Sequence, residues 1–305
     1  MRHRFSAFAF AFAFAAFVPA ALVADASADE LDFSEIPADA EWVAHLDAEA
    51  FLDSRIGAAL FAWWDESGDS GKARMVAELF SVDLEEDVRS VTLFDDGYGE
   101  DEQVVLIDAD VDTDWLLRFV AFFPDHRIET VDGVEVHSWW DEGRNRPVFG
   151  TVADEVVVVA STAADVAWAG GVLAGRSKSV ADARGPLAFD AADAIVAVGF
   201  GRPPAERLPK RIDLPEGVGP VSVCFDQSDD AVHMIGRLAA EADVVRRVED
   251  VCRGVVAFGR MIVGDAADGA ELIRELADAA SVRRDGDAVV VETRLSEATL
   301  FDSVE

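Results

Sequence analysis

Short runs of alternating apolar and polar residues occur along most of the chain, and this pattern predicts many β-strands. In the first half, strands are expected at residues 42–46, 88–94, 103–107, 134–140, 147–152 and 155–160. In the second half, they are expected at residues 195–200, 221–225, 232–238 and 288–295. Because short turns join most consecutive strands, the predicted sheets are mostly antiparallel.

Apolar residues spaced three and four apart predict helices between these strands. The expected helices cover residues 48–64, 72–80, 113–123, 163–174, 239–263 and 269–280, followed by a short terminal helix. Asp112 is a suitable N-cap, and Pro124 follows the end of its helix. On the long helix 239–263, an apolar stripe is expected to face the sheet, formed by Val244, Val248, Val251, Val255 and Ile262. The predicted fold class is α+β, with helices packed on one face.

The order of elements recurs, which predicts two related halves produced by duplication. Three pairs of segments match in order, residues 91–95 with 221–226, 104–107 with 232–235, and 132–136 with 285–289. The polar, glycine-containing stretch between the halves is typical of a linker. The predicted organisation is therefore a signal peptide at 1–28, a first domain at 29–176, a linker at 177–186 and a second domain at 187–305.

The first 28 residues have the pattern of a secretory signal peptide. Basic residues at 2 and 4 precede an uncharged run over 5–24, which Pro19 interrupts, and small residues mark two cleavage sites. An uncleaved membrane anchor is the alternative. The absence of Cys near these sites excludes a lipoprotein anchor. We expect a soluble mature protein that begins at Ser27 or Asp29 and acts in the periplasm or outside the cell.

Acidic residues dominate the chain, with 60 Asp and Glu against 26 Lys and Arg and a net charge of −34. The leader holds two Arg and one Asp, so cleavage would leave a net charge of −35. Nucleic acid and anionic membrane surfaces carry the same sign and are excluded as partners. Apolar residues make up 51% of the chain, which predicts a packed core rather than disorder.

The two cysteines, Cys224 and Cys252, could form a disulfide in an exported protein. Strand alternation places Cys224 on the face opposite Phe225 and the two valines beside it. The long helix that contains Cys252 is expected to pack on the Phe225 face, because that burial is the larger apolar gain. The two thiols are therefore predicted to lie on opposite sides of the sheet and to remain unbonded.

One acidic motif is a candidate metal site, because alternate carboxylates can supply oxygen ligands to Ca²⁺. Its members are Asp108, Asp110, Asp112 and Asp114. However, Thr113 stands where an EF-hand loop requires Gly, and Phe119 stands where its bidentate Glu belongs. The alternative is a structural role, in which Asp112 caps the helix and Asp114 favours its positive end. No other cofactor is predicted.

Histidine and tryptophan provide few further signals. His45, His126, His137 and His233 are scattered without metal-ligand spacing. All seven Trp lie in the first half, and Trp139 and Trp140 are adjacent on a predicted strand. One of these two should therefore face away from the core, where it could stack on a sugar or a partner protein. The alternative is that a helix covers the second face.

Residues 80–92 lead from a helix through acidic residues into a strand, with the sequence Phe-Ser-Val-Asp-Leu-Glu-Glu-Asp-Val-Arg-Ser-Val-Thr. This stretch resembles uncharacterised exported bacterial proteins with domains of unknown function, and the resemblance covers mainly residues 36–176. It implies no activity, cofactor or site.

No catalytic motif is present, since Gly-x-Ser-x-Gly is absent and Gly68–Lys72 lacks the features of a phosphate-binding loop. The predicted function is a non-enzymatic binding or structural module with a protein or small-molecule partner. One alternative is an exported hydrolase that uses carboxylates in a cleft between the halves. The other is a carrier of an apolar ligand.

Overall fold

The computed structural model describes most of the chain between residues 31 and 299. The described residues are 31–55, 57–58, 87–97, 103–141, 145–183, 187, 189–191, 194–201, 217–228, 231–262, 270–296 and 298–299. The chain packs into two compact units, residues 1–188 and residues 189–305. Both units are built from antiparallel strands and helices, so the α+β class is confirmed.

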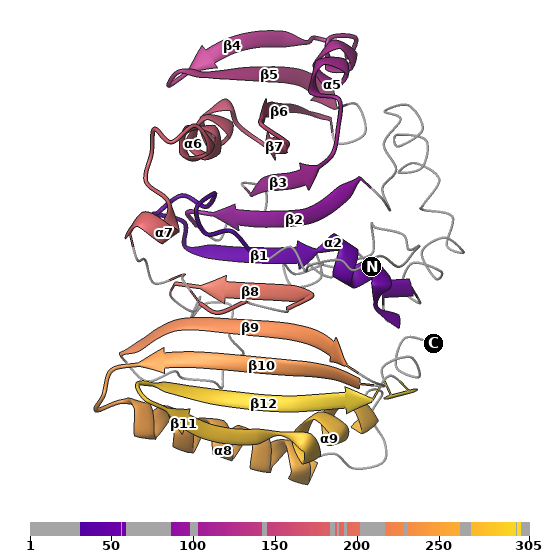
Figure 1. The fold of residues 1–305 in the computed structure, drawn as a ribbon. Helices are drawn as coiled ribbons and strands as arrows, with labels where there is room; N and C mark the ends of the chain where they lie inside the picture. The colour runs from indigo at the N-terminus through magenta and orange to yellow at the C-terminus, as the bar shows by residue number, and fades with distance from the viewer. Residues whose placement is uncertain are drawn as a thin grey trace. The chain divides into compact units, whose positions relative to one another are not determined.

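The first unit contains seven antiparallel strands in the order β1-β2-β3-β7-β6-β5-β4 (Figure 1). The strands are β1 Trp42–Asp47, β2 Val88–Asp95, β3 Val104–Ala109, β4 Arg127–Val131, β5 Val134–Asp141, β6 Arg146–Ala153 and β7 Val156–Ala160. The described helices are α2 Ala48–Asp53, α5 Thr113–Val120, α6 Ala163–Leu173 and α7 Val180–Ala183.

Helix α6 covers one face of this sheet and builds its main core. The strand register places Val104, Val136 and Val158 on that face, and all three are fully buried. At the start of α6, the Thr162 hydroxyl accepts a hydrogen bond from the Asp165 N–H at 3.2 Å. This N-cap satisfies a backbone donor that has no partner within the helix.

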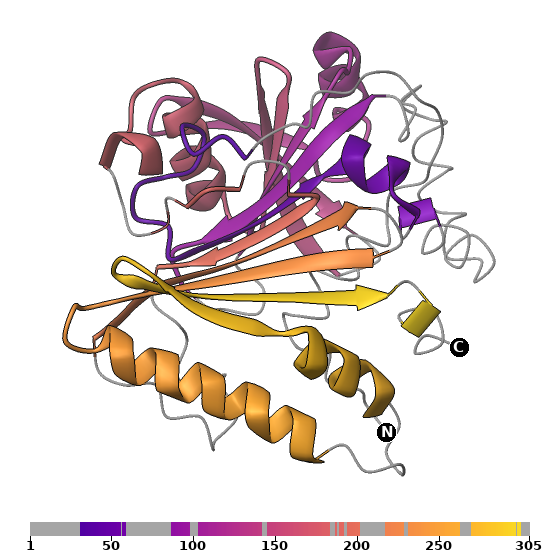
Figure 2. The same ribbon diagram turned by 60° about the horizontal axis from the view of Figure 1, so that its bottom comes forward.

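The second unit contains five antiparallel strands in the order β11-β12-β10-β9-β8. They are β8 Val196–Phe200, β9 Val218–Ser228, β10 Ala231–Ala240, β11 Ser281–Asp285 and β12 Ala288–Ser296. Helices α8 Val245–Ile262 and α9 Ala270–Ala279 lie on the same face of this sheet (Figure 2). The core between helix α8 and the sheet includes Val245, Val248 and Val289.

Most strands predicted from apolar alternation are present, but β4 and β11 were missed. Both are short, exposed and rich in charged residues, so they have no apolar pattern that predicts a strand. The helix predicted over residues 48–64 is interrupted, because α2 ends at Asp53 and Ser54 is extended. Its residues 59–64, the predicted helix over 72–80 and most of the terminal helix lie outside the described residues. No helix in the described part of the chain is long and apolar enough to cross a membrane.

The expected sheet-facing stripe of the long helix was partly wrong. Residues 239 and 240 belong to β10, and the helix begins at Val245. Val245, Val248 and Cys252 face the sheet, whereas Val251 and Val255 are exposed. Spacings of three and four residues from Val248 lead to both Val245 and Cys252 on one side and Val251 and Val255 on the other, and packing on the sheet selected the first side.

Part of the predicted linker belongs to the first unit. Helix α7 begins within it, and Ser179 and Val180 are buried. The Val180 N–H donates to the Ile36 carbonyl at 2.8 Å, and Pro37 pairs with Ser179 as an isolated β-bridge. These contacts fix residues 179–183 against the beginning of the described chain.

Candidate functional site

Four aromatic rings form a continuous row in the first unit, and we take this row as the candidate site. Trp115 stacks on Phe119 with ring centroids 5.4 Å apart, and Phe119 meets Phe123 edge-on at 5.2 Å. Phe123 then stacks on Trp139 of β5 at 5.8 Å. All four side chains are half-buried. The aromatic row therefore joins α5 and the turn after it to the sheet.

Local sequence explains most of this arrangement. The three rings before β5 are spaced four residues apart, which aligns them along one side of a helix and its last turn. The Asp112 carboxylate accepts from the Trp115 N–H at 2.9 Å and fixes the start of α5. The turn is attached to β5, because the Trp140 N–H donates to the Pro124 carbonyl at 3.0 Å.

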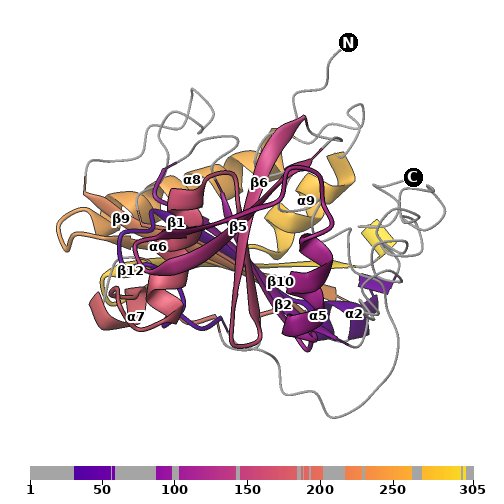
Figure 3. The same ribbon diagram turned by 90° about the horizontal axis from the view of Figure 1, so that it is seen from above.

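The adjacent tryptophans of β5 lie on opposite faces of the sheet, as strand alternation predicts. Trp140 lies on the side of the sheet that carries α6 and is 38% exposed. Trp139 lies on the other side, where Phe123 and the backbone around Gly150 contact its ring. Figure 3 shows α6 and α5 on either side of β5 in the view from above.

Two histidines lie beside the aromatic row and form a hydrogen-bonded chain with a carboxylate. His126 Nε2 is 3.1 Å from His137 Nδ1, and His137 Nε2 is 3.3 Å from Glu135 Oε1. The contacts are satisfied when neutral His137 donates from Nε2 to Glu135 and accepts at Nδ1 from His126. Burial lowers the pKa of His126 below the ordinary value of about 6.5, and repulsion between the two imidazolium rings when both are protonated lowers it further.

Two exposed apolar side chains come from the segments next to the aromatic row. Phe122, which precedes Phe123, is 86% exposed, and Ile128 on β4 is 56% exposed, whereas exposed Trp140 lies on the other face of the sheet. The second unit has a separate apolar surface on the outer side of α8, formed by Val251, Val255, Phe258 and Met261. Large exposed apolar groups that lie together are typical of interaction surfaces.

The stacking favours a protein partner over a sugar. A sugar ring stacks on the free face of an aromatic ring. In this row, Phe119 and Phe123 each contact rings on both sides, and Trp139 lies between Phe123 and Gly150. Phe122 and Ile128 add exposed apolar area beside these partly covered rings. Such a surface is suited to the apolar side chains of another protein.

The aspartates considered for calcium lie in different local structures and have different partners. Asp108 accepts a hydrogen bond from Arg89 at 2.6 Å, and the same guanidinium contacts Glu155 at 2.5 Å. These contacts, first of all the one with Asp108, raise the pKa of Arg89. Asp112 caps α5, and Asp114 lies in its first turn.

No group of three or more metal-ligating side chains converges within the described part of the chain. Asp110 is exposed beyond the end of β3, and Asp108 is committed to Arg89. Within the described residues, the motif considered for Ca²⁺ spans the end of a strand and the cap of a helix.

Both cysteines are free thiols. Cys224 lies opposite Ile235 in the register, and its thiol donates to the Asp190 carbonyl at 3.6 Å. Cys252 packs on the other side of the sheet with the core of α8. Burial raises the pKa of the Cys224 thiol to about 11 and also raises that of Cys252.

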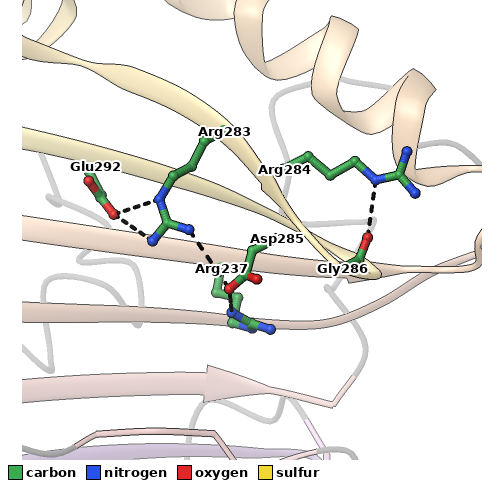
Figure 4. Close-up of polar contacts among 6 residues, drawn as sticks. All are labelled: Arg237, Arg283, Arg284, Asp285, Gly286 and Glu292. Atoms are coloured by element: carbon green, nitrogen blue, oxygen red, sulfur yellow. Dashed lines mark hydrogen bonds and ion pairs between the residues drawn. The ribbon is translucent and has the colours of Figure 1, made fainter.

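The sheet face opposite α8 carries a ladder of ion pairs (Figure 4). Arg283 contacts Glu292 at 2.8 Å, and Arg237 contacts Asp285 at 3.0 Å. Arg283 is also 3.8 Å from Asp285. These side chains are about half-exposed, and exposed pairs of this kind contribute about 0–1 kcal/mol each. We regard the ladder as cross-strand pairing of β10, β11 and β12 rather than as a site.

Comparison with known proteins gives a likeness of fold alone. No protein-family model and no curated protein matches the sequence. The chain is similar to the solved "Structure of crystal form III of TP0453", with a TM-score of 0.50 and 8% identity over 90% of this chain and 98% of that one. Crystal forms IV and I of TP0453 give TM-scores of 0.45 and 0.41, also at 8% identity. They cover 91% and 90% of this chain and 97% of each TP0453 chain.

Proposed function

We propose that this protein is an exported, non-enzymatic binding module that contacts a partner protein through the aromatic row of its first unit. The observation that carries the proposal is a row of four contacting aromatic rings, together with exposed Phe122 and Ile128 on the adjoining segments. Aromatic side chains are enriched at protein interfaces because they bury a large area at little conformational cost.

Four carboxylates around the aromatic row and β3 have structural roles. Asp108 and Glu155 are held by Arg89, Asp112 caps a helix, and Glu135 accepts from His137. Each therefore has a structural partner.

Selection of linear peptides from a random library on the purified protein tests this proposal. Phe122→Ser should weaken the selected peptides at least tenfold, because the substitution removes the most exposed ring beside the aromatic row. Met261→Ser is the matched control, since Met261 is 82% exposed on α8 in the second unit. Loss of binding in the Met261 variant alone, or binding of oligosaccharides but no peptide, would contradict the proposal.

We also propose that residues 1–28 are removed on export. The charged start, the apolar run and the small-residue sites support this processing. Intact-mass measurement of the secreted protein should give an N-terminus at Ser27 or Asp29. Retention of residues 1–24 would instead indicate a membrane anchor.

The two units are further proposed to derive from one duplicated ancestor. Phe94 of β2 pairs with Val43 near the start of β1, and Phe225 of β9 pairs with Val196 at the start of β8. Both phenylalanines are on helix-covered faces, as shown by the Phe94–Trp168 contact and by the register of Phe225 with β10 and β12. The hairpin match is poorer, because the two aligned glycines occupy different turn positions. In relatives of this chain, the segments that correspond to 91–95 and 221–226, and to 104–107 and 232–235, should be more similar to each other than the rest of the two halves is.

A further inference from the structure

Strand β4 forms an edge of the seven-stranded sheet, and its register shows which backbone groups face outward. The β4–β5 hairpin turns at Asp132 and Gly133, both with positive φ, and Val131 pairs with Val134 beside this two-residue loop. In such a hairpin the residues flanking the loop exchange hydrogen bonds, and the pattern then alternates. The N–H and C=O groups of Ile128 and Thr130 therefore point away from β5.

Strand β11 is the edge of the five-stranded sheet, and side chains of the protein itself lie against its outward groups. The same alternation makes Val282 and Arg284 the outward residues of β11. The Val282 carbonyl accepts from Arg253 of α8 at 3.2 Å, and Arg284 Nε donates to the Gly286 carbonyl at 3.1 Å (Figure 4). Arg253 thus occupies an outward carbonyl of this edge and Arg284 lies folded over the adjoining turn, and charged side chains at an edge are a common protection against strand addition.

No comparable protection is present on β4 within the described residues. No described side chain or backbone group hydrogen-bonds to the outward groups of Ile128 or Thr130. The side chains of both residues are exposed and lie on the same sheet face as His137 and Trp139. Strand pairing at this edge would therefore place alternate partner side chains beside Ile128 and the aromatic row.

Charge indicates the chemistry of the partner. Residues 112–141, which form α5, β4 and β5, contain seven Asp or Glu and two Arg. On the other face of β4, exposed Glu129 lies two residues from exposed Arg127, so an added strand meets one carboxylate and one guanidinium there. An added strand would accordingly gain from basic residues on the Glu129 side and apolar residues on the Ile128 side.

We infer that β4 receives an extended segment of a partner protein in which basic and apolar residues alternate, and that this segment adds as an eighth strand to the first unit. The inference rests on the proposed function, because it specifies how the partner meets the aromatic surface. Main-chain hydrogen bonds to Ile128 and Thr130 supply affinity, and the alternating side chains supply specificity.

An eight-residue peptide of alternating Lys and Val is the probe, and tryptophan fluorescence of the full mature protein measures its binding. Thr130→Pro removes an outward N–H while leaving the pairing with β5, so binding should weaken at least tenfold. Thr130→Val keeps the N–H and a β-branched side chain, so it should bind within twofold of the unchanged protein. Circular dichroism confirms that both variants are folded.

A second measurement does not depend on the variants. The same peptide N-methylated at alternate residues keeps its charge and side chains but cannot pair as a strand, so its binding should also fall at least tenfold. Equal binding of both peptides would mean that charge alone attracts them, which overturns the inference. No binding of the unmodified peptide would overturn it as well.

Two further outcomes distinguish the alternatives. Weaker peptide binding in Phe122→Ser with no change in Thr130→Pro would reject strand addition and leave the proposed function standing. Sedimentation that shows a dimer, with a monomer for Thr130→Pro, would make a second copy of this chain the occupant of β4 and overturn the inference.

Discussion

Gly170 lies where α6 crosses β5 and β6, and its replacement by Ala tests how closely this helix packs. An added Cβ would lie 2.9 Å from Val134 Cγ1, 3.3 Å from Val134 Cγ2 and 3.5 Å from Thr151 Cγ2. Carbon atoms in good contact are about 3.5–4.0 Å apart. Val134 is buried and stiff at χ1, so the methyl group can be accommodated only by moving the helix or the strand.

The magnitude follows from two opposing effects. Extra methyl groups in a packed core cost about 1–3 kcal/mol. Replacing Gly by Ala inside a helix contributes about 0.5–1 kcal/mol in the other direction. Packing prevails, and Gly170→Ala should lower the free energy of unfolding of the first unit by about 1–2 kcal/mol.

Gly171→Ala is the matched control in the same helix. Its added Cβ would meet mainly the Ser177 hydroxyl at 3.1 Å, and this group can rotate away. The helix-propensity gain then dominates, and stability should rise by about 0.5 kcal/mol.

Urea unfolding followed by tryptophan fluorescence measures both variants. All seven Trp lie between residues 42 and 168, so this signal reports the first unit. With a slope of about 2 kcal/mol per M, the two midpoints should differ by about 1 M. A stabilised Gly170→Ala, or equal shifts for both variants, would refute the close approach of α6 to Val134.

Three further predictions concern single side chains. Because the pKa of His126 is lowered in the folded state, the unfolded chain binds more protons than the folded chain just below pH 6.5. The free energy of unfolding should therefore fall as the pH drops from 7.5 to 5.5. Urea unfolding at each pH should show a smaller fall for His126→Gln. Thiol titration of the denatured, unreduced protein should give two free thiols. In the native protein Cys224 should react about a hundredfold more slowly at pH 8 than a model thiol, and rapid reaction would contradict its burial. Asp112→Ala should destabilise the first unit by about 1 kcal/mol in urea unfolding, whereas Asp112→Asn should cost little, since Asn also caps helices.

The sequence alone determined the fold class and most strand positions, because alternating apolar residues reflect burial of one sheet face. It also predicted the cap at Asp112 and the opposite faces of Trp139 and Trp140, which depend only on local geometry. The separation of the two thiols was predicted for the same reason, since Cys224 alternates with Phe225 along one strand.

Part of the aromatic row also had a local signal that was not used. Trp115, Phe119 and Phe123 recur every four residues, which is enough to align three rings. The fourth ring, Trp139, comes from a separate strand, and no local spacing relates it to the other three.

Only the tertiary structure decided the remaining features. Strand β4 lacks an apolar pattern and exists because β5 pairs with it across a tight turn. Asp108 forms an ion pair with Arg89 of the neighbouring strand β2, and Arg89 also contacts Glu155, 66 residues further along the chain. No local pattern in the sequence indicates these contacts. The outward position of Val255 was decided by which side of Val248 packs on the sheet. Periodicity in sequence indicates that one side of an element is buried, but strand register and the orientation of the helix determine which distant residues meet.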